Sequence, residues 1–323
     1  MRRDKQERVE FAGVEITHPD RLLYPDTGIT KAELAQFYFD MADRILPHIV
    51  GRPLSVIRCP EGLDPHAAIK GIHQTFRGPR LTKCFFQKHS SRGTAGAVRT
   101  VLAPEQHKMA EYLAVKDVKD LVTLIQFGTL ELHPWGSRAD KPDLPDRMFF
   151  DLDPGPAVPW EAVVEAARTV REILDSFGLS SFLKTTGGKG LHVVVPLARK
   201  NSWDEVKAFS LAIAERMSRN DPAKYVPTMA KHLRAGKIFV DYLRNARGST
   251  AVAPYSTRAR PGAPVSTPIA WSEIADTPPD AFGVRNLRER LGRLRRDPWV
   301  GFRECRQSIT KEMGETARSV KTA

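Results

Sequence analysis

An apolar segment that ends in two carboxylates constrains the fold of this chain more than any other feature. The segment Phe-Phe-Asp-Leu-Asp-Pro-Gly occupies residues 149–155. Because residues i and i+2 of a strand point to the same face, it predicts a strand that presents Asp151 and Asp153 side by side at a sheet edge. Two carboxylates this close favour a cation between them, and hard divalent cations prefer oxygen ligands. A solvated strand end with two acidic residues is the alternative that this pattern leaves open.

A third carboxylate favours the metal interpretation. Asp241 ends the apolar segment Lys-Ile-Phe-Val-Asp at residues 237–241. An aspartate in such a strand needs a partner, because burying it unpaired is costly. Two metal ions need about three carboxylates between them, and Asp241 would complete that set. The alternative is a structural ion pair with Arg244 or Arg247.

A glycine-rich segment, Lys-Thr-Thr-Gly-Gly-Lys-Gly-Leu-His, occupies residues 184–192 between two predicted strands. Glycines let backbone N–H groups approach phosphate oxygens, while Thr186, Lys189 and His192 offer side-chain donors. The segment is not a Walker A motif, because the GxxxxGK[ST] pattern is absent and no helix follows directly. We expect it to bind a triphosphate; a simple hairpin turn is the alternative.

Basic residues are concentrated after the third aspartate. Four arginines lie between residues 244 and 260, at Arg244, Arg247, Arg258 and Arg260. Their planar guanidinium groups suit bidentate binding of phosphates, although a solvated basic loop has the same composition. His133 follows a predicted strand, where it contacts a phosphate or serves a structural role.

The N-terminal region contains a second candidate anion site. Residues 30–33, Thr-Lys-Ala-Glu, form a capping box that predicts the start of a helix. A helix N-terminus with cations beside it is suited to an anion, so Arg21 and Lys31 are candidates for binding a terminal phosphate. Phe85 and Phe86 alternate along a predicted strand; one ring could stack on a nucleic-acid base, and core packing is the alternative.

Composition narrows the partner and the compartment. The chain carries 50 Lys and Arg against 38 Asp and Glu, a formal charge of +12, which favours polyanionic partners. The cysteines at positions 59, 84 and 305 stand far apart, so we expect a reducing compartment and no disulfide framework. No apolar run approaches the roughly 20 residues that span a bilayer, and no signal peptide is evident. A soluble cytoplasmic protein is expected, without a membrane partner.

Helical and extended patterns alternate along the chain. Apolar residues at helical spacing predict a helix from residue 30 that ends at Pro47, and further helices over 117–127, 159–177, 203–219 and 285–296. Strands are expected near 11–16, 54–58, 85–86, 98–102, 129–133, 147–151, 181–185, 191–196 and 238–242. Short spacings near 181–196 favour antiparallel pairing. The fold class is therefore α+β (mixed α/β), with one site cleft.

Taken together, these segments resemble a known family. The Asp-Leu-Asp strand end, the glycine-rich segment and Asp241 resemble the three motifs of archaeo-eukaryotic primases. More specifically, HPDRLLYPDTGITK, GRP, FFQKH, DLDPGPAVPW, FLKTTGGKGLHVVVPL and GKIFVDYLRNARGSTAVAPYSTRARPGAPVS are similar, in order, to the polymerase domain of bacterial ligase D. The resemblance runs from about residue 11 to 300, with a basic tail expected over 301–323. It implies a primase-like core of antiparallel or mixed sheets flanked by helices.

The resemblance also implies an activity, namely a primase-polymerase that extends and fills DNA ends and gaps in bacterial non-homologous end joining. It would use two Mn²⁺ or Mg²⁺ ions and NTP or dNTP on gapped duplex with a 5′-phosphate, near the nucleoid, with Ku and a DNA ligase as partners. It implies metal binding and catalysis by Asp151, Asp153 and Asp241, nucleotide binding by His133, Thr186, Lys189, His192, Arg244 and Arg258, and DNA binding by Arg21, Lys31, Arg58, Phe85, Phe86 and Lys88.

Two departures from the family pattern stand out. The segment from about residue 64 to 83 is longer than expected and brings four cations, at Lys70, Arg77, Arg80 and Lys83. No ligase or nuclease segment is recognised, so sealing is expected to need a partner ligase. Two other classes remain open at this level: a metal-dependent phosphoesterase, which would shorten nucleic acid, and a non-catalytic protein that bridges DNA ends.

Overall fold

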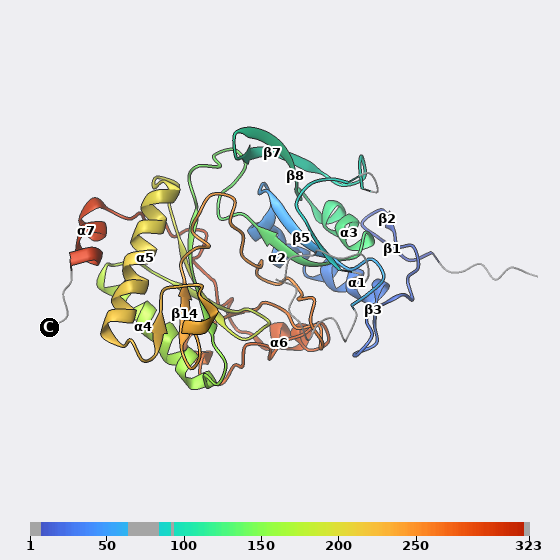
Figure 1. The fold of residues 1–323 in the computed structure, drawn as a ribbon. Helices are drawn as coiled ribbons and strands as arrows, with labels where there is room; N and C mark the ends of the chain where they lie inside the picture. Colours follow the sequence, from blue (N-terminus) through green and yellow to red (C-terminus); the bar gives the residue numbers. More distant parts are fainter. Residues whose placement is uncertain (1–7, 64–83, 92–93, 320–323) are drawn as a thin grey trace, which may run out of the picture.

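The N-terminal half of the molecule is built on a five-stranded antiparallel sheet. The computed structural model describes residues 8–63, 84–91 and 94–319 (Figure 1). The sheet has the order β6-β5-β8-β7, with β9 also paired to β5. Its strands are β5 (Leu54–Arg58), β6 (Phe85–Gln87), β7 (Thr100–Glu105), β8 (Lys108–Leu113) and β9 (Thr129–Pro134).

Two small hairpins and three helices complete this half. The hairpins are β1 (Glu10–Phe11) with β2 (Val14–Glu15) and β3 (Leu22–Tyr24) with β4 (Ile29–Thr30), and the helices are α1 (Lys31–Asp40), α2 (Ala42–Ile49) and α3 (Val118–Gln126). The predicted capping box is present: the Thr30 hydroxyl accepts from the Glu33 amide, and the Glu33 carboxylate accepts from the Thr30 amide. A single apolar core joins these helices to the sheet.

The prediction of one helix ending at Pro47 is wrong. The chain turns at Met41, which ends α1 and begins α2, and Pro47 lies inside α2. Proline lacks the N–H that would bond to the Asp43 carbonyl, but in so short a helix this removes one hydrogen bond rather than ending the helix. The apolar spacing is continuous across the turn because both helices pack on the same core.

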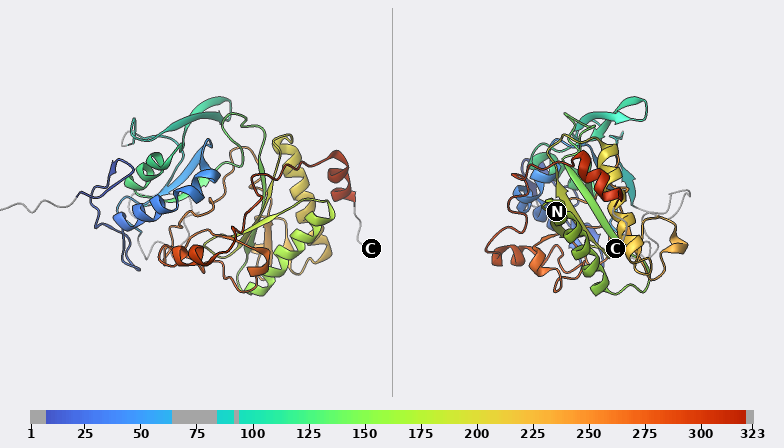
Figure 2. Two further views of the ribbon diagram at one scale, coloured as in Figure 1. Left: turned by 180° about the vertical axis from the view of Figure 1, so that it is seen from behind. Right: turned by 90° about the vertical axis from the view of Figure 1, so that its left-hand side faces the viewer.

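The C-terminal half is built on a six-stranded sheet of order β13-β14-β10-β12-β11-β15. Only the β13–β14 pair is parallel. The strands are β10 (Arg147–Pro154), β11 (Phe182–Thr185), β12 (Leu191–Pro196), β13 (Tyr225–Val226), β14 (Ile238–Asp241) and β15 (Pro268–Ile269). Helices α4 (Trp160–Ser176) and α5 (Trp203–Asn220) cover its outer face (Figure 2). The mixed α/β class is confirmed, and the opposite face turns toward the N-terminal half.

The segment after residue 300 packs on the domain over much of its length. Two short 3-10 turns, Lys231–Leu233 and Trp271–Glu273, and helix α6 (Leu287–Arg293) precede it. Asn201 donates to the Ile309 carbonyl at 2.8 Å, and helix α7 (Lys311–Ser319) lies against α5. Within the described residues, no helix is long and apolar enough to cross a membrane.

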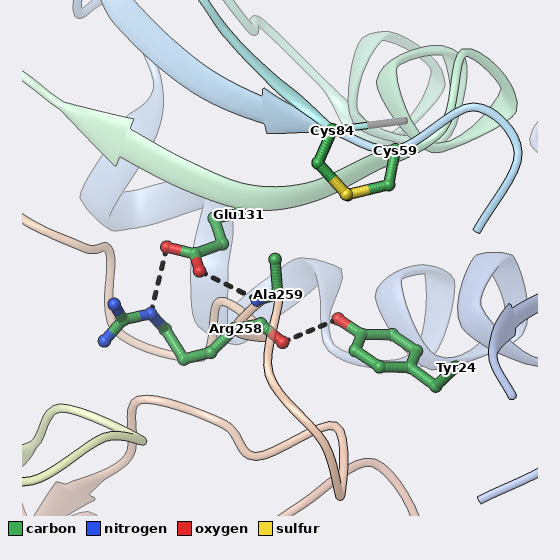
Figure 3. Close-up of a disulfide and its surroundings, with 6 residues drawn as sticks. All are labelled: Tyr24, Cys59, Cys84, Glu131, Arg258 and Ala259. Atoms are coloured by element: carbon green, nitrogen blue, oxygen red, sulfur yellow. Dashed lines mark hydrogen bonds and ion pairs between the residues drawn. A yellow bond between two sulfur atoms is a disulfide. The ribbon is translucent and has the colours of Figure 1, made fainter. Parts of the chain in front are cut away.

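The expectation that the cysteines would stay unpaired is corrected, because Cys59 and Cys84 form a disulfide (Figure 3). Arg58 and Phe85 are register partners in the antiparallel β5–β6 pair. Cys59 follows the first and Cys84 precedes the second, so the register brings the two cysteines face to face. The spacing of the cysteines in the sequence could not predict this disulfide, because the pairing of β5 with β6 brings them together. Residues 64–83, the segment with four cations, lie outside the described part of the chain.

We expect this bond to stabilise the fold measurably. The cysteines are separated by 25 residues, and closing a loop of that size removes about 3 kcal/mol of unfolded-chain entropy. In buffer without reductant, Cys59→Ser should therefore lower the melting temperature by about 5 °C. Adding reductant should lower the wild-type value to that of the variant, whereas Cys305→Ser should have no such effect. Three reactive thiols in denatured, unreduced protein would contradict the pairing.

Candidate functional site

The centre of the site is a row of three residues on adjacent strands. Strand β10 lies between β12 and β14, and its Asp151 faces His192 on one side and Asp241 on the other. Cross-strand partners share a sheet face. The register therefore places two of the predicted acidic residues next to His192, which the sequence predicted to bind the nucleotide.

One arginine balances the two adjoining carboxylates. Arg244 Nε lies 3.4 Å from Asp151 Oδ2 and 3.4 Å from Asp241 Oδ2. Burial, followed by the nearby Asp151 charge, raises the pKa of Asp241 to about 6. Burial also opposes ionisation of Asp151, yet His192 and Arg244 together hold its pKa well below the usual value. Adjacent carboxylates with unequal proton affinity are an environment that a cation would stabilise.

The third aspartate has a different neighbour. Asp153 is half exposed and pairs with Arg234, which precedes β14. The Arg234 guanidinium also lies over the Phe239 ring, 4.6 Å from its centroid. In the part of the chain that the structure describes, no three acidic, histidine or cysteine side chains converge as a metal-binding group. In the structure, Asp151 thus lies next to Asp241 on the neighbouring strand, whereas Asp153 pairs with an arginine.

His192 forms the other end of the row. Its Nε2 lies 3.4 Å from Asp151 Oδ1, and its Nδ1 is buried without a hydrogen-bond partner among the described residues. Burial and the neighbouring Lys184 lower the pKa of His192 to about 4, so the ring is neutral at physiological pH. An orphaned buried nitrogen beside a carboxylate is the type of group that a ligand or water satisfies.

The glycine-rich segment forms a tight hairpin between β11 and β12. The Thr186 hydroxyl donates to the Gly190 carbonyl at 3.0 Å, so it serves inside the turn. Gly187 has φ of +64°, a conformation that favours glycine. A Cβ on Gly190 would collide with the Leu152 carbonyl oxygen. The hairpin can therefore lie directly against the strand that carries the aspartates.

These elements surround one cavity of about 510 Å³ between the two sheets. The N-terminal half contributes three lining residues, Ile57, Phe86 and His133. Of the residues predicted for the site, those that line it are Phe86, His133, Asp151, Asp153, Thr186, Lys189, His192, Arg244 and Arg258. The cavity thus brings together cations, backbone amides and carboxylates, a combination that suits a phosphate ligand with an associated cation.

Residues predicted to bind DNA lie outside that cavity, except Phe86. The Lys31 ammonium donates to the Thr17 carbonyl at 2.8 Å, and Arg21 donates to the Pro60 carbonyl at 2.8 Å. Burial, followed by the Arg21 charge, lowers the pKa of Lys31 to about 8. The structure thus places these two cations close together at the start of α1, and their binding of a terminal phosphate stays a prediction.

The aromatic strand β6 presents both of its rings to solvent. Phe85 is 38% exposed and Phe86 is 53% exposed, so neither is a core residue. Arg58 is buried and donates to the Phe127 carbonyl and to Gln87, with its guanidinium 5.2 Å from the Phe85 centroid. Lys88 pairs with Glu105. Arg58 therefore supports the exposed ring from behind, and Phe85 and Phe86 offer stacking surfaces.

Three residues that the sequence did not identify shape the site. Arg234 pairs with Asp153, Glu131 contacts His133 and Arg258, and Asn245 bonds to the backbone of β10. The Asn245 side chain accepts from the Phe149 amide at 2.8 Å and donates to the Phe149 carbonyl at 2.7 Å. The roles of these three residues depend on tertiary contacts. Only the position of Asn245 next to Arg244 in the sequence could have indicated that it lies near the site.

Two sheets that enclose acidic and basic side chains, with Asp151 and Asp153 on an antiparallel strand inside the second sheet, are typical of a primase-like fold. A family model described as "LigD, primase-polymerase domain" matches residues 30–299. The chain belongs to this family.

Similar proteins agree with that assignment. The multifunctional non-homologous end joining protein LigD of Pseudomonas aeruginosa is 38% identical over 308 residues, which is 95% of this chain and 35% of that protein. The corresponding DNA repair protein of Mycobacterium tuberculosis is 33% identical over 292 residues, 88% of this chain and 36% of that protein. This chain thus spans about a third of the length of these relatives.

A solved structure shows the same fold. The polymerase domain from Mycobacterium tuberculosis ligase D, in complex with DNA, matches with a TM-score of 0.74 and 30% identity. The match covers 87% of this chain and 94% of that one. The predicted family and fold are therefore confirmed.

Because the hairpin lies so close to β10, we expect that adding one methyl group at Gly190 strongly lowers the stability of the fold. Gly190→Ala should push the hairpin away from Leu152 and lower stability by roughly 1–3 kcal/mol. Gly292→Ala should be neutral or slightly stabilising, because Gly292 lies in α6 with no atom near the added methyl. Urea unfolding of both variants measures the difference. Equal stability of the two variants would contradict this packing.

Proposed function

We propose that this chain is a template-directed nucleotidyltransferase that extends primer ends and fills gaps in DNA during non-homologous end joining. The carrying observation is the row Asp241–Asp151–His192, of which Asp151 and His192 line a cavity that is also lined by basic side chains. The family membership and the similarity to a polymerase domain in complex with DNA support the same activity. Phosphoryl transfer needs a bound triphosphate next to a group that neutralises charge, and this cavity offers residues for both.

Divalent cations fit the carboxylates by their chemistry. Asp151 and Asp241 place hard oxygen donors on adjacent strands, and Asp153 adds a third on the same strand as Asp151. When bound, two Mn²⁺ or Mg²⁺ ions would lower the pKa of the primer 3′-hydroxyl and neutralise the triphosphate. The three aspartates would hold them, after Arg234 is released from Asp153. Asp241 is our candidate for the base that accepts the hydroxyl proton.

The remaining residues take roles that follow from their positions. Arg258 and Lys189 would stabilise negative charge on the triphosphate, with His133 and His192 as further contacts. Arg244 would exchange its carboxylate partners for phosphate oxygens. The exposed Phe86 at the cavity edge suits stacking on a template base.

Lys31 and Arg21 form the proposed pocket for the 5′-phosphate across a gap. Their ordered ammonium and guanidinium groups suit a doubly charged terminal phosphate. We further propose that Ku and a DNA ligase act with this chain, that Mn²⁺ is favoured, and that the chain acts in the cytoplasm at the nucleoid, as the family resemblance implies.

The first test is extension of a primer on gapped, 5′-phosphorylated duplex with Mn²⁺. Wild type should lengthen the primer, and Asp151→Ala should lower the rate at least about a hundredfold while DNA affinity is kept. Asp175→Ala, which removes an exposed carboxylate on α4, is the matched control and should retain full activity. A shortened primer would indicate a phosphoesterase, and tight binding without product would indicate an end-bridging protein.

Lys31 predicts an unusual pH dependence. With its pKa lowered to about 8, the free ammonium is lost as pH rises above 8 rather than near 10.5. The preference for 5′-phosphorylated over unphosphorylated gaps should therefore fall about tenfold between pH 7 and pH 9. Lys31→Arg should keep its preference at pH 9, since arginine stays charged. An identical pH profile of the binding ratio in both proteins would exclude Lys31 from the phosphate pocket.

A further inference from the structure

Glu131 lies behind the cavity and contacts two of the residues that line it, His133 and Arg258. It is on β9, is 1% exposed and does not line the cavity itself. Its Oε2 accepts from His133 Nε2 at 2.7 Å and from Arg258 Nε at 2.9 Å, and its Oε1 accepts from the Ala259 amide at 2.8 Å. One carboxylate thus satisfies donors on β9 and on the 258–259 segment; Figure 3 shows its contacts with Arg258 and Ala259.

The contacts of Arg258 extend this arrangement to the glycine-rich hairpin. Arg258 Nη1 donates to the Thr186 carbonyl at 2.6 Å. The Tyr24 hydroxyl donates to the Arg258 carbonyl at 2.9 Å, so the backbone is held as well (Figure 3). Glu131 therefore sets the position of an arginine that connects three separate segments around the cavity. The orientation of Arg258 is thus fixed by its contacts with Glu131 and with the Thr186 carbonyl.

The same carboxylate determines which nitrogen of His133 is protonated. An ionised carboxylate only accepts hydrogen bonds, so His133 Nε2 must carry a hydrogen. Nδ1 is then the nitrogen left for a ligand, and it becomes a donor when the ring is protonated. Burial lowers the pKa of His133 and outweighs the opposing effect of the Glu131 charge, so the neutral ring is favoured. Without this carboxylate, the ring could adopt the other tautomer.

Glu131 is ionised despite its burial. Burial opposes its ionisation, but Arg258 and His133 outweigh that effect and keep the pKa of Glu131 well below its ordinary value. A buried carboxylate of this kind balances the positive charge of Arg258 and also accepts a hydrogen bond from His133. Replacing the carboxylate by an amide would leave one oxygen acceptor and turn an NH2 group toward at least one of the buried donors.

We propose that Glu131 is a positioning residue for nucleotide binding: it holds Arg258 and the Nε2-protonated tautomer of His133 in the geometry that receives the triphosphate. Glu131 acts through these two side chains and does not contact the nucleotide. This inference rests on the proposed polymerase function. It adds a residue that lies outside the cavity and that no pattern in the sequence identified.

The test compares Glu131→Gln with a matched buried acid elsewhere. Asp146→Asn removes a partly buried carboxylate that pairs with Arg52 and Arg147, just before β10 and away from the catalytic row. In Glu131→Gln, KM for the nucleotide should rise tenfold or more, on the order expected for lost charge-assisted hydrogen bonds, while Kd for gapped DNA changes less than about twofold. Asp146→Asn should lose thermal stability but keep the nucleotide KM.

Outcomes separate this inference from the proposed function. If wild type does not extend primers, the proposed function fails. If wild type extends and Glu131→Gln keeps its nucleotide KM, the positioning role is overturned. Should Glu131→Gln not fold, ¹⁵N NMR of the wild-type histidines decides, with His133→Gln used for assignment. His133 is expected to be protonated at Nε2; a ring protonated only at Nδ1 would overturn the proposal.

Discussion

The pairing of β10 with strands on both sides is the constraint on which the rest of the site depends. Asp151 faces Asp241 and His192 only because β10 keeps one register with β14 and β12. That register is fixed by the fully buried Phe150 and Leu152, whose side chains pack with α4 and α5. A slip by one residue would turn Asp151 toward the helices and an apolar residue toward the cavity. Core packing on one face thus determines the chemistry on the other.

The second requirement is that two separate cores meet at one cavity. The C-terminal sheet supplies the carboxylates and the glycine-rich hairpin, whereas the N-terminal sheet supplies Phe86 and His133. Arg258 connects the two parts, because it pairs with Glu131 of β9 and donates to the Thr186 carbonyl of the hairpin. Buried pairs of this kind fix relative positions more than they add stability. This contact therefore fixes the positions of the side chains around the cavity more than it stabilises the packing of the two halves.

Local patterns in the sequence could predict the parts of the molecule that depend on local physics. The Asp-Leu-Asp strand end, the capping box at Thr30 and the glycine-rich hairpin all follow from near neighbours, and the structure contains each. The Cys59–Cys84 disulfide, the pairing of Arg234 with Asp153 and the role of Glu131 depend on contacts between distant segments. Strand β8 was also missed, because its exposed lysine, methionine and glutamate hide the alternation typical of a strand.

The arginines beside the aspartates explain how so acidic a row is tolerated in a buried wall. Arg244 lies between Asp151 and Asp241, and Arg234 accompanies Asp153. A carboxylate removed from water needs a nearby positive charge, and a guanidinium supplies it without a hydrated ion. Both arginines are on flanking segments of β14 rather than on its paired residues, so their side chains can move without altering the strand register. Exchange of partners, from carboxylate to phosphate oxygen, then requires only side-chain rotation, while the row of acidic residues stays fixed by the sheet.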